Sequence, residues 1–280
     1  MTRLPTVIAT WRSRTMPLSG VLLVLALAAG QVAVADEDEE EEEGERTEAL
    51  EASRDWLGGI PAAPTEDWEI GFGGRLYDNW FEALAVDEPE GTHPAYPAAG
   101  QQQGAATWRC KECHGWDYKG RDGEYGSGSH ATGIVGIQAM VGADPSAIRA
   151  IIEDETHGYT PEMIPPEAMD RLARFVTRGQ HEADLYFDGA TGRVLGEAEP
   201  GERYYQNICA PCHGFDGKAL NFSGDPDAPE YVGTVAVENP LEALHKIRNG
   251  QPGQPMPALR VLPRQDVVDI LAYIRTLPTE

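Results

Sequence analysis

The chain of 280 residues carries 46 acidic side chains against 22 basic ones, which gives a formal net charge of −24. A polyanion of this size repels phosphate backbones and anionic lipid heads, so the composition argues against nucleic acid or a membrane surface as a partner. Basic protein partners are compatible with it, and the length allows one large domain or two small ones.

Residues 1–35 have the pattern of an export signal. Three arginines precede the apolar run Leu18–Ala29, and Ala33-Val34-Ala35 offers the small residues that a signal peptidase needs. The run is shorter than the roughly 20 apolar residues of a spanning helix, and Gln31 interrupts it. We therefore expect cleavage before Asp36, a mature protein without a stable membrane span, and a periplasmic location.

Residues 36–99 are predicted to form an N-terminal extension. It opens with an acidic run that we interpret as a solvated tail, and a docking arm for a basic partner is the alternative. The remainder contains Trp56, Trp68 and Trp80, and one helical face carries Leu76, Phe81 and Leu84 beside Trp80. Because unpacked tryptophans would leave a large apolar patch, we expect this segment to pack on the domain that follows it.

Two Cys-x-x-Cys-His pentads contain all four cysteines of the chain. They are Cys110–His114 and Cys209–His213, called the first and the second pentad below. In an exported protein this pattern is typical of c-type haem attachment, with two thioethers to the vinyl groups and the histidine beneath the iron. A zinc site would bring its cysteine pairs within about 15 to 20 residues, and a thioredoxin-like motif does not need the histidine twice. Two disulfides are the remaining alternative.

The predicted haem-binding residues are therefore Cys110, Cys113, Cys209 and Cys212, and the predicted proximal iron ligands are His114 and His213. Each pentad would hold one covalently bound haem c, which makes the chain a two-haem protein.

Internal matches indicate a duplicated unit. Cys110 matches Cys209 at an offset of 99 residues, Asp144-Pro145 matches Asn239-Pro240 at 95, and residues 164–175 match 262–273 at 98. We therefore divide the chain into a first repeat at residues 100–180, a linker at residues 181–199 and a second repeat at residues 200–280.

A sixth ligand for each iron is expected downstream of its pentad. Residues 249–257 form a Pro/Gly-rich loop that presents Met256 between two prolines, a poor place for core packing and a suitable one for a thioether ligand. Met163 occupies the corresponding loop of the first repeat and is the predicted ligand there. His157 in the same loop and His93 upstream of the first pentad are the alternatives. Three other histidines are expected to be exposed or to bind a haem propionate, namely His130, His181 and His245.

The remaining pattern predicts a mainly α fold. In the second repeat, helices are expected at residues 201–208, from Pro240 with Asn239 as its cap, and from 263 to 276. The last of these has an apolar stripe at Val267, Ile270, Leu271, Ile274 and Leu277. In the first repeat, Asp144-Pro145 marks the same kind of helix start, and a last helix is expected from Pro166 to about Arg178, before Gly179. Its leading helix is shortened, or is replaced by residues further upstream.

Both repeats resemble class I cytochrome c domains, in the order of leading helix, pentad, middle helix, methionine loop and last helix. The resemblance covers about residues 100–280 and implies two tandem helical domains, each around a covalent haem. It also implies that Met256 and Met163 are the distal ligands of two His/Met-ligated irons.

This resemblance implies a carrier of single electrons between periplasmic redox proteins, rather than an enzyme. Its partners would be a donor and an acceptor protein, of basic charge, or a larger oxidoreductase of which it is a subunit. The alternative is a dihaem oxidoreductase similar to thiosulfate dehydrogenases or peroxidases, with the first haem catalytic. The catalytic haem of the former family carries a cysteine as distal ligand, and this chain has no fifth cysteine.

Overall fold

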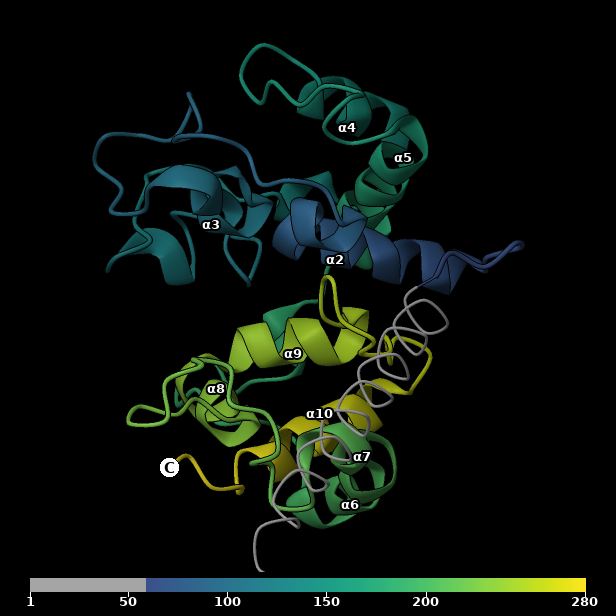
Figure 1. Ribbon diagram of the computed structural model, residues 1–280, viewed down its shortest axis with the longest axis vertical. Helices are drawn as coiled ribbons and strands as arrows, with labels where there is room; N and C mark the ends of the chain where they lie inside the picture. Colours follow the sequence, from purple (N-terminus) through teal and green to yellow (C-terminus); the bar gives the residue numbers. More distant parts are fainter. Residues whose placement is uncertain (1–58) are drawn as a thin grey trace, which may run out of the picture. The chain divides into compact units, whose positions relative to one another are not determined.

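The computed structural model describes residues 59–280 (Figure 1). The predictions for the export signal, for the acidic run and for Trp56 therefore lie outside the described residues.

The first repeat shares one hydrophobic core with the extension before it. Its helices are α2 (Glu66–Leu84), α3 (Cys110–His114), α4 (Pro145–Ile152) and α5 (Pro166–Arg174), which the π-helix η4 (Phe175–Gly179) continues. Short 3-10 turns lie at η1 (Gly104–Trp108), η2 (Glu124–Gly126) and η3 (Gln138–Met140), and η5 (Ala183–Leu185) follows the repeat. Figure 1 shows α2 alongside α5, and the predicted apolar face of α2 is buried there at Leu76, Trp80 and Phe81 and half-buried at Leu84.

The second repeat forms a separate core. Its helices are α6 (Ala198–Tyr204), the π-helix η6 (Tyr205–Cys209), α7 (Ala210–His213), α8 (Val232–Glu238), α9 (Pro240–Asn249) and α10 (Arg264–Ile274). Helix α6 packs against α10 (Figure 1), and all five residues of the predicted apolar stripe of α10 are buried.

The predicted helix starts are present in both repeats. The Asn239 side chain accepts a hydrogen bond from the Glu242 N–H, and Asp144 accepts one from the Ser146 N–H. In each case a proline stands at the beginning of the helix, where its missing N–H costs nothing. Met169 is fully buried in the first core, as its place on the last helix predicts.

The fold of the described residues is mainly helical, as predicted. Between residues 59 and 280 no strand forms, and only two isolated bridges occur, Gly120 with Val135 and Phe187 with Val194. None of the helices in this part of the chain combines the length and the hydropathy that crossing a bilayer requires.

Helices α2 and α6 cross the last helix of their repeat at a glycine. A Cβ atom at Gly73 would collide with the Arg171 carbonyl of α5, and one at Gly201 would collide with the Asp269 carbonyl of α10. Both crossings therefore bring backbone against backbone, which any larger side chain would prevent. Helix α2, from the upstream extension, thus takes the place in the first repeat that α6 takes in the second.

The same two helices are tied to their pentads by a tyrosine. Tyr77 of α2 donates a hydrogen bond of 2.6 Å to the carbonyl of Gly115, the residue after the first pentad. Tyr205, at the end of α6, donates one of 3.0 Å to the carbonyl of Gly214 after the second pentad. Each tyrosine follows its crossing glycine by four residues, so Gly-x-x-x-Tyr is a shared signature of the leading helices.

Helix α2 also contacts the second repeat through a buried carboxylate. Asp78 is fully buried and forms ion pairs with Arg109 at 2.6 Å and with Lys246 of α9 at 2.8 Å. Burial opposes ionisation of Asp78, but Lys246 and Arg109 outweigh it and hold the pKa of that carboxyl well below its usual value. Asp78 therefore links α2 to Arg109, just before the first pentad, and to α9 of the second repeat.

Two of the three histidines that were expected to be exposed or to bind a haem propionate are buried. His181 and His245 are 3% and 0% exposed, and the Nδ1 atoms of both lie within hydrogen-bond distance of the Tyr118 hydroxyl. The Nε2 atom of His245 lies 2.9 Å from the carbonyl of Gly74. Burial lowers the pKa of His245 to about 4, so this residue is a neutral core group rather than a surface one.

Replacing Asp78 with alanine should lower the free energy of unfolding by about 3 kcal/mol, because two cations lose their buried partner. The matched control is Asp170→Ala, which removes an exposed ion pair with Arg149 and should cost less than about 1 kcal/mol. Urea unfolding of both variants measures the difference, and equal losses would contradict the structural role of Asp78.

Gly73→Ala and Gly201→Ala should each destabilise the protein by roughly 1 to 3 kcal/mol, since the added methyl group separates two packed backbones. Gly189→Ala is the control, because a Cβ atom there has nothing within 4 Å. Thermal unfolding of the three variants tests this, and a tolerated Gly73→Ala would show that the α2 crossing is looser than described.

Candidate haem sites

All four pentad cysteines are free thiols in the structure. No disulfide joins the cysteines of either pentad in the structure. Burial raises the pKa of Cys110 and Cys113 to about 12 and that of Cys209 to about 11, which keeps these thiols protonated and available. The two cysteines of each pentad therefore remain free to form two thioether bonds.

The imidazole of His114 is oriented by a backbone carbonyl. Its Nδ1 atom lies 2.8 Å from the carbonyl oxygen of Val135, so Nδ1 is the donor and Nε2 is left with a free lone pair. Burial lowers the pKa of His114 to about 4, which keeps the ring neutral, as a metal ligand must be. A carbonyl behind a ligating histidine is a usual arrangement in metal sites.

The imidazole of His213 has a different environment. Burial lowers its pKa as well, so this ring is also neutral near pH 7. Its buried Nδ1 atom has no hydrogen-bond partner among residues 59–280. The two pentads thus present the same donor atoms, but only the first has the orienting carbonyl.

The turn after each pentad is built in the same way. The Asp117 side chain accepts a hydrogen bond from the Lys119 N–H, and Asp216 accepts one from the Lys218 N–H. The next residue in each turn donates its N–H to the carbonyl of the pentad histidine, at 3.0 Å in both repeats. This His-Gly-aromatic-Asp-x-Lys turn fixes the histidine backbone, and its pattern is present in the sequence of both repeats.

The surroundings of the second pentad fit a large apolar group. The Phe222 ring lies 6.0 Å from the His213 ring, and Phe222 is 46% exposed. Phe215 and Leu220, which also follow this pentad closely, are exposed too. An aromatic ring beside a neutral imidazole, and exposed apolar side chains close to the pentad in the chain, suit the face of a porphyrin, so the residues present fit a covalently bound haem.

Helix α2 holds the loop that carries Met256. The buried Arg75 guanidinium donates a hydrogen bond of 2.9 Å to the carbonyl of Asn249 and another of 2.9 Å to the carbonyl of Met256. Gly250 between them has a φ of +85°, and a Cβ atom there would collide with the Met256 carbonyl. The Met256 side chain itself is half-buried.

In the first repeat the structure separates the three candidates for the distal position. Met163 is half-buried and packs against the first core. Both ring nitrogens of His93 are in use, Nδ1 with the Ala95 N–H and Nε2 with the carbonyl of His157. The ring of His157 lies opposite that of His114, with centroids 6.3 Å apart.

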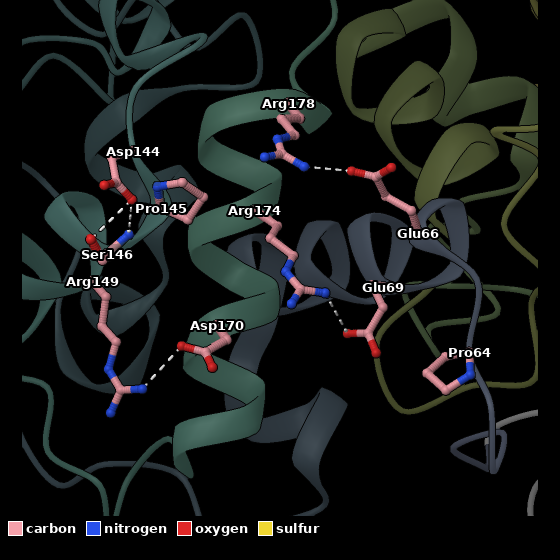
Figure 2. A pocket seen from close by; sticks show the side chains of 10 residues that line it. All are labelled: Pro64, Glu66, Glu69, Asp144, Pro145, Ser146, Arg149, Asp170, Arg174 and Arg178. Carbon is pink, nitrogen blue, oxygen red and sulfur yellow. Dashed lines mark hydrogen bonds and ion pairs between the residues drawn. The ribbon is translucent and has the colours of Figure 1, made fainter.

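A charged hollow between α2, α4 and α5 lies away from the pentads. Figure 2 shows its three arginines, and each one has a carboxylate partner. The pairs are Arg149 with Asp170, Arg174 with Glu69, and Arg178 with Glu66. We interpret these pairs as solvated surface contacts that contribute little to stability.

One family model matches the chain. It is described as "Cytochrome C oxidase, cbb3-type, subunit III" and covers residues 196–274, from just before α6 to the end of α10. The match shows a c-type cytochrome domain in this part of the chain, which implies a covalently bound haem c and electron transfer. No curated protein and no solved structure matched the chain.

Arg75→Gln should destabilise the Met256 loop, because two charge-assisted hydrogen bonds to its backbone weaken or disappear. The expected loss in free energy of unfolding is roughly 2 to 4 kcal/mol. In the oxidised protein the weak near-infrared band of methionine sulfur on ferric iron should also decline. The control is Arg178→Gln, which removes an exposed ion pair with Glu66. If both variants keep the full band, α2 does not position Met256.

Proposed function

We propose that the protein is an exported dihaem cytochrome c that transfers single electrons between redox proteins of the periplasm. One observation carries the proposal: the first repeat lies outside the matched residues 196–274, and it has the same local structure as the matched domain. The first repeat has the same glycine crossing, the same tyrosine bond to the residue after the pentad and the same turn behind the pentad histidine.

Each repeat would hold one haem c. The thioether residues are Cys110 and Cys113 in the first and Cys209 and Cys212 in the second, with His114 and His213 as proximal ligands. Met256 is the distal ligand of the second iron, and its loop is clamped by Arg75. Met163 is the sequence-based expectation for the first iron.

A haem c supplies reversible one-electron chemistry when it is bound, and the residues of the chain decide whether substrate can also reach the iron. Val135 fixes the orientation of His114, and Arg75 restrains the loop of Met256. A protein with both axial positions taken leaves no place for substrate, which favours a carrier over an oxidoreductase.

The charge of −24 supports basic redox proteins as donor and acceptor. A larger oxidoreductase with a basic docking surface is compatible with the same field. The export pattern of residues 1–35 supports a periplasmic place for this exchange.

The proposal is tested by a reductive titration of the purified protein, combined with exposure to carbon monoxide. We expect uptake of two electrons per chain, slow or weak binding of carbon monoxide at both irons, and no turnover of hydrogen peroxide or thiosulfate. Rapid binding at one iron together with turnover of either substrate would instead favour the dihaem oxidoreductase with a catalytic first haem. Uptake of a single electron would contradict the two-haem proposal.

Electron exchange with a basic redox protein should be fast at low ionic strength. Its rate should fall steeply as salt is raised to 0.1 M, where charges are screened over a Debye length of about 10 Å. Stopped-flow measurements at several salt concentrations test this, with an acidic redox protein as the control. A rate that does not depend on salt would contradict electrostatic docking.

A further inference from the structure

We propose that His157 is the distal ligand of the iron held by the first pentad, in place of Met163. The inference rests on the proposed function, since it requires a haem at the first pentad. It would make the first iron bis-histidine and leave the second with His213 and Met256.

The spacing of the two rings carries the argument. The centroids of His114 and His157 are 6.3 Å apart. A metal to imidazole bond is about 2 Å long, and the ring centroid lies about 1 Å behind the ligating nitrogen, so two imidazoles on opposite sides of one ion have centroids about 6 Å apart. The observed centroid separation is close to this value, and the ring planes are 29° from parallel, an angle that two imidazoles on one ion can adopt.

In each ring the Nδ1 atom has a hydrogen-bond partner, which leaves the Nε2 atom available for a metal. The Nδ1 atom of His114 lies 2.8 Å from the carbonyl oxygen of Val135, and the Nδ1 atom of His157 lies 3.3 Å from an oxygen of Asp154. Ligating histidines commonly donate their second N–H to a carbonyl or a carboxylate. Both imidazoles are therefore in the tautomer that carries the proton on Nδ1 and leaves the lone pair of Nε2 free for a metal.

The backbone around His157 is held from several directions. The Asp154 side chain accepts hydrogen bonds from the N–H groups of Thr156 and His157, at 2.8 and 3.0 Å. The His157 carbonyl lies 2.9 Å from Nε2 of His93. With both of its nitrogens engaged, His93 acts as a support of this loop and not as a ligand.

The loop is also fastened to the start of the first pentad. Tyr159 is buried, and its hydroxyl donates a hydrogen bond of 2.6 Å to the carbonyl of Trp108, two residues before Cys110. His157 and the pentad are therefore positioned by the same contact. Met163 lies four residues beyond Tyr159, and its side chain packs against the first core.

The repeat matches place both His157 and Met163 in the loop that corresponds to the loop of Met256. Counted from the pentads, which match at an offset of 99 residues, the counterpart of Met256 is His157. The matches before and after the loop have offsets of 95 and 98 residues, so the register does not choose the ligand and the ring geometry carries the assignment.

A consequence is that the two haems differ in reduction potential. A methionine ligand raises the potential of haem iron relative to a second histidine. The first site would therefore have the lower potential and would pass electrons to the second.

The full-length protein with both haems provides the test, by near-infrared and electron paramagnetic resonance spectra of the oxidised form and a redox titration. The expected result is a methionine-to-iron band with the strength of one haem, a bis-histidine signal from the other, and two separate redox steps. His157→Ala should abolish the bis-histidine signal, raise the lower potential and allow carbon monoxide to bind at one iron. Added imidazole should restore the original spectrum. Met163→Leu and the loop control Glu155→Ala should change none of these signals.

The inference is overturned if the unmodified protein has the methionine band of two haems, or if Met163→Leu halves that band. A haem count by the pyridine haemochrome method separates this failure from failure of the proposed function. Two haems with the wrong ligand overturn only the role of His157, whereas a single haem per chain overturns both proposals.

Discussion

The close crossing of a leading helix over a last helix is the constraint on which the rest of the structure depends. It requires glycine at Gly73 and at Gly201, because only a residue without a Cβ atom lets the two backbones touch. Once this crossing is made, Tyr77 and Tyr205 reach the residue that follows each pentad. The position of each pentad is therefore fixed by helix packing some distance away from it.

Helix α2 contacts both repeats, so the two repeats are not independent domains joined only by a linker. It completes the core of the first repeat, and its Arg75 and Asp78 bind Met256 and Lys246 of the second. Buried ion pairs of this kind contribute specificity of arrangement rather than much net stability. We infer that the second methionine loop depends on a helix that the first repeat also needs, so that the repeats are coupled in folding.

Much of the fold could be predicted from the sequence, because the caps at Asp144 and Asn239 and the apolar stripe of α10 are local patterns. Replacement of the first leading helix by upstream residues was one of two alternatives that the sequence left open. The structure decides between them, since residues 85–109 separate α2 from the first pentad and its match to α6 lies at an offset of 128 residues, not 99. The burial of His245 was missed for another reason: its partners Tyr118 and Gly74 are distant in the chain. The pentads are evident in the sequence, whereas the proposal of His157 in place of Met163 rests on the geometry of the loop.

The central claim is that both pentads hold haem, and peptide mass spectrometry of the protein tests it most directly. After proteolysis, the account predicts that the peptide with Cys110 and Cys113 and the peptide with Cys209 and Cys212 each carry the mass of one haem. Replacing Cys110 and Cys113 with alanine should remove the first mass addition and leave the second. Haem on the second peptide alone, with free thiols or a disulfide on the first, would contradict the account.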